Sequence, residues 1–181
     1  MTRIKILERE EMNEDQGRVY DEAKASGGPV GGPYIAYLRH PELMLRIQDL
    51  RKCLQNGPLS ARERQIAHLV IARHWGAKYP WFAQVGASLA AGVEQNIIDA
   101  INTRNDPGFN HPREQAAYEV AKELLADHGL SDATYAAAEK ALGLDDLVAL
   151  VVTVGQFSTT CCTTNAFDVS PPDDAPTPLA G

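Results

Sequence analysis

One histidine in segment 60–91 is placed where it could move a proton. Gln65 and His68 are three residues apart, so a helix would hold both side chains on one side, about one turn apart. Imidazole titrates near neutral pH and can act as a general acid or base, whereas a glutamine amide only donates and accepts hydrogen bonds. We therefore predict His68 as the catalytic residue. A hydrogen-bonded histidine at a helix or subunit interface is the structural alternative.

The same segment carries a cation and aromatic rings that could hold an organic ligand. Arg73 and His74 lie at the predicted C-terminal end of a helix, where positive charge is favoured for structural reasons. Exposed to a pocket, Arg73 could instead bind a substrate carboxylate through two hydrogen bonds. The aromatic candidates, which would suit a flat or cyclic ligand but are also ordinary core residues, are Tyr34, Tyr79, Trp81 and Phe82.

The three cysteines and the remaining histidines do not form a cofactor or metal motif. Cys53, Cys161 and Cys162 match neither a disulfide framework nor a zinc pattern. On a helix, the adjacent Cys161 and Cys162 side chains point about 100° apart. They are predicted as buried small hydrophobic residues, with a thiol peroxidase as the alternative. His68 and His74 lie on different helix faces, so we expect no metal, and no cofactor site is visible.

Helical patterns fill the chain and predict an all-α fold in a single domain over residues 1–181. Ser60 and Glu63 form a capping box at the start of a central helix, Gly76 ends it, and Pro80 begins the next. A glycine- and proline-rich turn at 27–33 brings Tyr34 to the pocket or core. The other helices are expected at about 13–26, 41–55, 93–101, 112–125, 135–142 and 144–165. Residues 1–12 read as an extended or loosely attached N-terminal arm, and residues 170–181 as a Pro-rich tail.

Charge and hydropathy restrict the partners. The 181 residues carry a formal net charge of −7, which argues against nucleic acid or an anionic membrane as the main partner. We expect no apolar run that approaches the ~20 residues needed to span a bilayer. The N-terminal segment is charged and lacks a signal-peptide core, so we expect a cytoplasmic protein. Helix 144–165 is apolar around most of its circumference, which predicts burial within a bundle or between subunits.

Segment 64–84, RQIAHLVIARHWGAKYPWFAQ, resembles the carboxymuconolactone decarboxylase and alkylhydroperoxidase D-like family. The likeness extends to Gly32-Pro33-Tyr34, to His40-Pro41-Glu42-Leu43 and to Asn165-Ala166-Phe167, and it covers residues 15–170 approximately. The resemblance implies an alkylhydroperoxidase D-like helical bundle and a homo-oligomer, a trimer or hexamer. It also places a pocket beside the two central helices.

The sequence departs from the family at the positions that do the family's chemistry. The peroxidase members use a C-x-x-C before a histidine, with a glutamate on the preceding helix as part of a proton relay. The resemblance puts that glutamate at Gln65, the cysteines at Ala77 and Pro80, and the histidine at Gln84. We therefore expect Gln65 and Gln84 to bind substrate oxygens, with His68 as a relocated acid or base.

Two classes of function follow. The first is a cofactor-independent lyase or isomerase of the decarboxylase type. It would act on a small cyclic or aromatic oxo-acid or lactone and bind it through Gln65, Gln84, Arg73, Tyr34, Tyr79 and Trp81. The second is a non-catalytic protein of the same fold that binds a ligand or serves in assembly. A thiol peroxidase that uses Cys161 or Cys162 is a third possibility.

Overall fold

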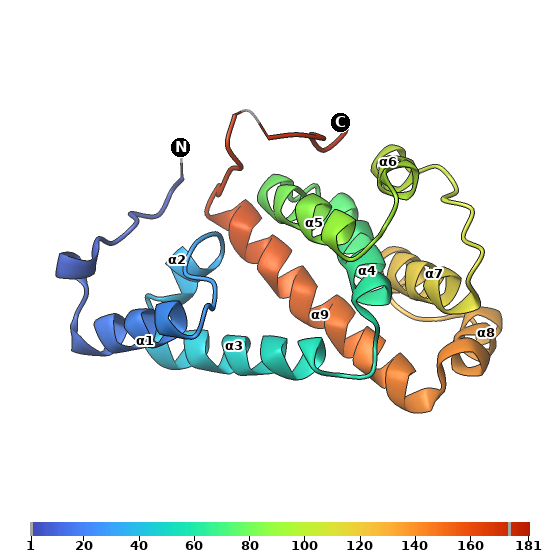
Figure 1. Ribbon diagram of the computed structural model, residues 1–181, viewed down its shortest axis with the longest axis horizontal. Coiled ribbons are helices and arrows are strands. Elements are labelled where there is room, and N and C mark those ends of the chain that lie inside the picture. The colour runs from blue at the N-terminus through green and yellow to red at the C-terminus, as the bar shows by residue number, and fades with distance from the viewer. Residues whose placement is uncertain (1, 174) are drawn as a thin grey trace.

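The computed structural model describes residues 2–173 and 175–181, which form helices joined by loops (Figure 1). No strand occurs in these residues, so the predicted all-α class is confirmed. The helices are α1 (Glu14–Ala25), α2 (Tyr34–Tyr37), α3 (Pro41–Gln55), α4 (Ala61–His74), α5 (Lys78–Ala90), α6 (Gln95–Thr103), α7 (Pro112–Asp127), α8 (Asp132–Leu142) and α9 (Leu144–Ala166). A short 3-10 helix, Arg9–Glu11, precedes α1.

The predicted capping box begins α4. The Ser60 hydroxyl accepts a hydrogen bond from the Glu63 backbone N–H, and the Glu63 carboxylate accepts one from the Ser60 N–H at 2.9 Å. These bonds satisfy two of the N–H groups that a helix start leaves free. Helix α5 begins at Lys78, two residues before the expected start, because Pro80 fits within the first turn of a helix as well as at its first position.

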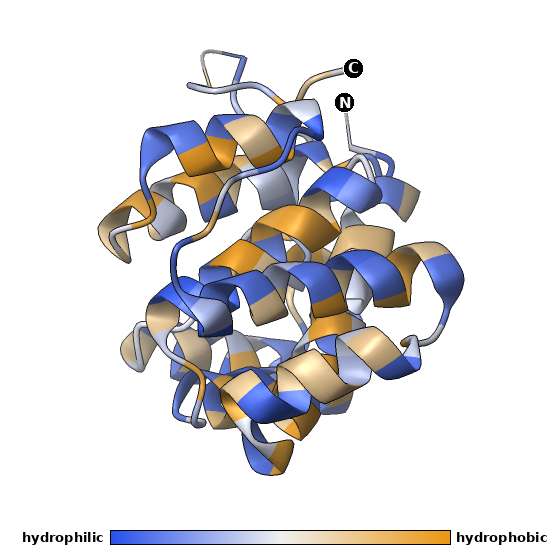
Figure 2. Cartoon of the chain, turned by 90° about the vertical axis from the view of Figure 1, so that its right-hand side faces the viewer, coloured by the Kyte–Doolittle hydropathy of each residue, from blue (hydrophilic) through white to orange (hydrophobic). Residues whose placement is uncertain are grey.

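Helix α4 is the central element of the larger core. Its buried side chains pack against α5, α7 and α9, which surround it in Figure 1. Figure 2 shows hydrophobic and hydrophilic residues alternating along the helices, as expected for helices with one buried face. The largest fully buried side chains of α4 are Ile66, Leu69 and Ile71. This packing fixes the backbone that carries Gln65 and His68.

Two networks of charged side chains attach α4 to its neighbours. Glu63 of α4 is buried, and Arg113 of α7 donates to both of its carboxylate oxygens at 2.6 and 3.1 Å. Arg113 also contacts Asp146 of α9 at 2.7 Å. Arg62 of α4 and the buried Glu114 of α7 form a second pair at 2.9 Å. Opposite charges thus align α4, α7 and α9 where their apolar faces meet.

Helices α1, α2 and α3 form a second, smaller apolar cluster beside the α4–α9 body (Figure 1). The N-terminal arm expected over residues 1–12, of which Met1 lies outside the described residues, is attached more firmly than predicted. The Arg3 N–H donates to the Phe167 carbonyl at 2.9 Å, and Arg9 binds Asp21 of α1 at 2.7 Å. The first contact ties the arm to the end of α9.

The Pro-rich tail, within which Asp174 lies outside the described residues, runs across α5 and α6. The Trp81 indole N–H donates to the Thr177 carbonyl at 2.9 Å. Asn102 of α6 donates to the Pro178 carbonyl at 3.0 Å and accepts from the Ala180 N–H at 2.9 Å. The tail therefore lies along the surface, as its composition indicates.

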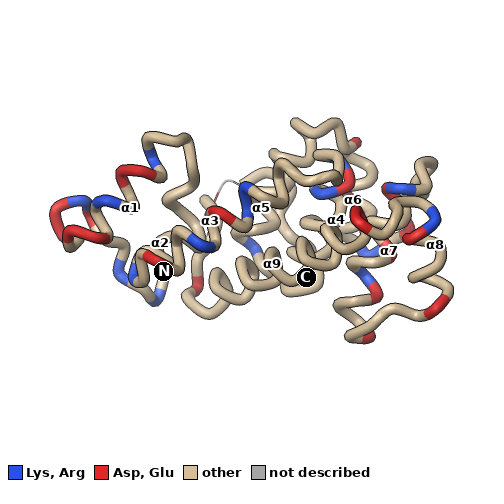
Figure 3. The backbone as a smooth tube through the Cα atoms, turned by 90° about the horizontal axis from the view of Figure 1, so that it is seen from below, with Lys and Arg blue, Asp and Glu red and all other residues tan. Residues whose placement is uncertain are grey.

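Helix α9 is partly exposed. It has 23 residues and carries no charged side chain after Asp146, which Figure 3 shows as an uncharged length of tube. By length and composition it could cross a membrane, which corrects the expectation that no run approaches this length. The core helix of a soluble protein can pass the same test, and Leu150, Phe157 and Cys161 of α9 are buried inside this fold. Its exposed apolar residues are Leu144, Val148, Val151 and Val152.

Candidate functional site

A cavity of about 340 Å³ lies between α3, α4, α5 and α9, and residues 29–34 form part of its wall. Its size is at the lower end of the range for small-molecule sites. The polar side chains that line it are Tyr34, Arg51, Gln55, Arg64, Gln65, His68, Tyr79, Gln84, Gln156 and Thr160. Leu54, Ala83, Ala87 and Phe157 supply apolar surface. The cavity therefore combines an apolar wall with many hydrogen-bonding groups.

His68 lies against the wall of this cavity, in contact with α9. Its ring stacks on Phe157, with ring centroids 4.1 Å apart and planes 23° from parallel. Burial lowers the pKa of His68 to about 4, against the opposing effect of the Gln84 side chain, and the positive charge of Arg64 lowers it further. The imidazole is therefore neutral at pH 7, and its Nδ1 atom is buried without a hydrogen-bond partner.

The depressed pKa of His68 predicts a loss of stability in mild acid. The unfolded chain binds a proton at His68 near pH 6.5, and the folded chain only near pH 4. Stability therefore falls as the pH decreases from about 6.5 to about 4, by at most roughly 3 kcal/mol, because each pKa unit corresponds to about 1.4 kcal/mol.

Urea unfolding at several pH values tests this expectation. Carboxylates also titrate in this range, so the quantity to compare is the difference in unfolding free energy between the native chain and His68→Gln. The unfolding free energy of the native chain minus that of His68→Gln should decrease toward pH 4. A difference that does not change between pH 7 and pH 4 would mean that His68 is not shielded from water.

Five of the predicted site residues meet at the cavity: Tyr34, Gln65, His68, Tyr79 and Gln84. Desolvation raises the pKa of both tyrosines, which keeps their hydroxyl groups protonated. The Gln65 amide oxygen is buried and has no hydrogen-bond partner. The structure thus gathers most of the residues that were expected to hold a substrate.

The structure places the other two predicted substrate-binding residues elsewhere. Arg73 does not line this cavity, because its guanidinium turns toward α6 and donates to the Asn102 carbonyl at 2.6 Å. Trp81 is 1% exposed in the core and donates to the tail carbonyl of Thr177. Arg73 thus holds α6 and Trp81 holds the tail, so neither side chain faces a ligand in this cavity.

The glycine-rich turn fits closely against the cavity. Gly32 has a φ of +60°, and a methyl group at its Cα would overlap the Tyr79 ring. Only glycine combines this backbone conformation with so near an approach. The turn therefore positions both Tyr34, which follows it, and Tyr79, which packs on it, as cavity walls.

Two basic residues of the cavity, Arg51 of α3 and Arg64 of α4, were not predicted from the sequence. Arg64 is four residues before His68, so helical spacing alone would have placed it on the same face. Arg51 reaches the cavity only because α3 folds back against α9, which no local pattern reveals. Its Nε atom is buried and has no hydrogen-bond partner. No aspartate or glutamate lines this cavity among the described residues.

The three cysteines are free thiols that differ in burial. Cys161 is buried, and burial raises the pKa of its thiol to about 12. Cys162 is exposed, which corrects the expectation that both adjacent cysteines are buried, and Cys53 is exposed as well. A thiol with so high a pKa is a poor nucleophile at neutral pH. No group of three or more histidine, cysteine, aspartate or glutamate side chains in residues 2–173 and 175–181 could hold a metal ion.

Comparison with known proteins defines the fold. No family model and no curated protein matches the sequence. Among solved structures, the chain is similar to an uncharacterized peroxidase-related protein from Ralstonia eutropha JMP134, described as an alkylhydroperoxidase AhpD core. The TM-score is 0.75 at 16% sequence identity, over 95% of this chain and 93% of that chain. The chain therefore has the alkylhydroperoxidase D fold, as the sequence resemblance predicted.

Proposed function

We propose that the chain is a cofactor-independent lyase or isomerase that acts on a small cyclic or aromatic oxo-acid or lactone in the His68 cavity. One observation carries the proposal: His68 Nδ1, Gln65 Oε1 and Arg51 Nε are all buried without partners, and all three residues line the same cavity. A buried polar atom that lacks a partner destabilises the fold by about 1–3 kcal/mol. A polar ligand would satisfy these atoms together.

The charge of the cavity supports an acidic ligand. Arg51 and Arg64 line it, no carboxylate does among the described residues, and the chain as a whole has a net charge of −7. Desolvation lowers the pKa of Arg64, against the opposing charge of Glu63, and its guanidinium donates to the Leu59 carbonyl at 2.7 Å. Guanidinium groups bind carboxylates with strong, directional hydrogen bonds. We therefore assign the ligand's carboxylate to Arg51 and Arg64.

Ligand binding would also tune His68. The positive charge of Arg64 lowers the pKa of His68 in the empty cavity, and a bound carboxylate would neutralise that effect. His68 then becomes a stronger base while it is still neutral. It removes a proton from a carbon next to the substrate's own carbonyl group, which takes up the electron pair as an enolate. The imidazolium then returns the proton to a carbon of the enolate, which completes an isomerisation and regenerates neutral His68. The amides of Gln65 and Gln84 are placed at the cavity to stabilise such an oxygen.

The test is a screen of ring-cleavage lactones and oxo-acids with the native chain. Exchange of a substrate proton for solvent deuterium, followed by NMR, detects the proton transfer, and CO2 release detects decarboxylation. We expect an acid to react and its methyl ester or amide to react far more slowly. Equal rates for the acid and its neutral analogue would contradict the carboxylate assignment. Absence of both proton exchange and CO2 release with every ligand that binds would contradict the enzymatic function.

That last result would favour the alternative, a non-catalytic ligand-binding protein. The observation in its favour is that the cavity holds amides at Gln65 and Gln84, where the resemblance predicts titrating groups. Binding without proton exchange distinguishes it from the lyase. The thiol peroxidase alternative is weakened by the high pKa of Cys161, which leaves the exposed Cys162 as its only candidate nucleophile on α9.

We also propose that the chain associates with copies of itself through α9. Leu144, Val148 and Val151 share a helical face, and their exposed fractions are 54%, 54% and 39%. Contiguous apolar surface of this kind is typical of an interface. We expect sedimentation velocity to show a trimer or hexamer for the native chain and a shift toward the monomer for Val148→Glu. The exposed, isolated Ile6→Glu is the control, and dissociation by both variants or by neither would contradict this interface.

A further inference from the structure

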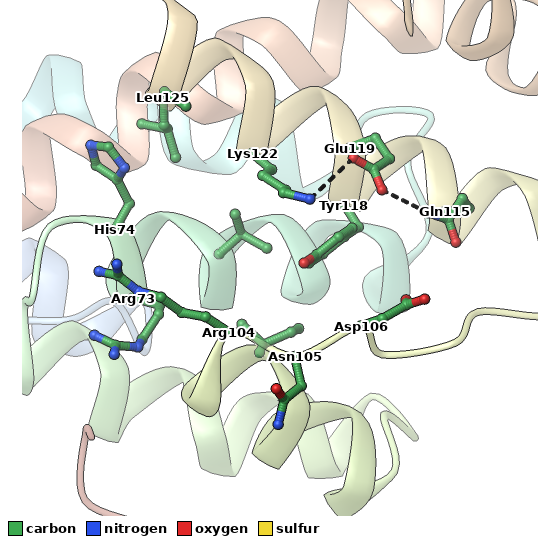
Figure 4. A pocket seen from close by; sticks show the side chains of 13 residues that line it. Arg73, His74, Arg104, Asn105, Asp106, Gln115, Tyr118, Glu119, Lys122 and Leu125 are labelled. Carbon is green, nitrogen blue, oxygen red and sulfur yellow. Dashed lines mark hydrogen bonds and ion pairs between the residues drawn. The ribbon is translucent and has the colours of Figure 1, made fainter. Parts of the chain in front are cut away.

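A second cavity, of about 570 Å³, has no role in the function proposed above. It is a groove between the end of α4, the loop after α6, and α7, and it shares no lining residue with the His68 cavity. Figure 4 shows the side chains that line it, among them Arg73, His74, Arg104, Tyr118 and Glu119. The groove is large enough for a small organic molecule.

Basic side chains gather at one end of this groove. The guanidinium groups of Arg73 and Arg104 lie near each other there, with His74 beside them (Figure 4). After desolvation, the charge of Arg104 is the main cause that lowers the pKa of Arg73, and it also lowers the pKa of His74. These groups repel one another in the empty groove. A bound anion would remove that repulsion.

The protein itself supplies little compensating charge at this end. Lys122 lies 3.7 Å from Glu119 and over the Tyr118 ring. Within residues 2–173 and 175–181, none of the ion pairs involves Arg73 or Arg104. Arg73 instead donates to the backbone carbonyl of Asn102 at 2.6 Å and to the backbone oxygen of Gly181 at 3.2 Å. Arg104 therefore has no salt-bridge partner in these residues, and the hydrogen-bond partners of Arg73 are backbone oxygens.

The rest of the groove is suited to an organic body. Val70, Ile101 and Leu125 provide apolar surface, and the buried Tyr118 provides a ring face. Asp106 and Glu119 lie at the other end (Figure 4). A ligand with acidic groups at both ends would be repelled there, whereas a neutral or hydrogen-donating end would be accepted. The groove is therefore basic at one end, apolar in the middle and acidic at the other end.

We propose that this groove is a second ligand site, for a small organic anion. Its phosphate or carboxylate group binds Arg73, Arg104 and His74, and its apolar body lies on Tyr118. This proposal is independent of the reaction in the His68 cavity, because the two cavities have no residue in common.

Calorimetric titration at low salt tests the proposal, with phenyl phosphate and benzoate as probes. We expect saturable binding of at least one probe, and the tighter one identifies the anionic group. Arg104→Gln should weaken that binding about 10- to 100-fold, because the variant loses a charge-assisted hydrogen bond to the anion. Arg104 is exposed, so this variant should fold normally. Arg3→Gln, which changes the net charge equally at an exposed site, should bind like the native chain.

The probes are acidic and could also enter the His68 cavity, so Arg51→Gln is needed as a further variant. Binding that is lost in Arg51→Gln but kept in Arg104→Gln would place the probe in the other cavity and overturn the proposal. Equal weakening by Arg104→Gln and Arg3→Gln would reduce the effect to net charge and overturn it too. Absence of saturable binding of both probes would have the same consequence.

Discussion

Replacing His68 with glutamine is expected to lower turnover of the cavity's substrate by roughly 10²- to 10⁴-fold, the usual contribution of a general acid or base. Glutamine keeps most of the volume and a hydrogen-bonding group, but it cannot accept a proton at neutral pH. Because the carboxylate contacts assigned to Arg51 and Arg64 are not changed, ligand affinity should stay within a few fold. The measurements are the rate of deuterium exchange at saturating substrate and a calorimetric titration of binding.

The matched control is His111→Gln, which removes an exposed histidine at the start of α7. It should leave both turnover and affinity unchanged. If His68→Gln retained near-native turnover, His68 would be a structural histidine and the enzymatic proposal would fail. If it instead lost binding in proportion to turnover, His68 would be a ligand-positioning residue in a binding protein.

Replacing Glu63 with alanine is expected to lower the free energy of unfolding by about 2–4 kcal/mol. The Glu63 carboxylate is buried, accepts two hydrogen bonds from Arg113 and also caps α4 through the Ser60 N–H. Removing one partner of such a group leaves the other partly desolvated and without its counter-charge. Arg113 keeps its contact with Asp146 and is partly exposed, which limits the loss. Urea unfolding followed by circular dichroism measures the effect.

Glu42→Ala is the matched control for this ion pair. Glu42 also contacts an arginine, Arg46, at 2.6 Å, but both side chains are more than half exposed. An exposed pair of this kind contributes about 0–1 kcal/mol. Similar losses in the two variants would show that the network between α4, α7 and α9 does not hold the core together.

Most of the helices could be predicted from the sequence because their ends are marked by local chemistry. Ser60 and Glu63, Ser131, Pro112 and Gly143 all stand at a helix boundary, as their types indicate. The start of α5 could not be placed exactly from the pattern, since proline is compatible with several positions in a first turn. The attachment of the N-terminal arm depends on long-range contacts such as Arg3 with Phe167, for which no local signal exists.

The candidate site was predicted only in part, for a related reason. His68, Gln65 and Gln84 could be found because they lie on two helices that are adjacent along the chain. Arg51 could not, because its helix reaches the cavity through the tertiary fold. Arg73 was misplaced because helical spacing gives a direction around the axis but does not say which neighbour occupies it. Here the neighbour is α6, whose Asn102 carbonyl binds the guanidinium.

Helix α9 carries Phe157, whose ring stacks on His68, and also the exposed valines about two turns away. An uninterrupted helix is stiff along its axis, so its two ends cannot move independently. A neighbouring molecule bound at Val148 or Val151 would therefore contact the same helix that orients the Phe157 ring. The reactivity of the imidazole would then depend on protein concentration, and dilution alone could alter it.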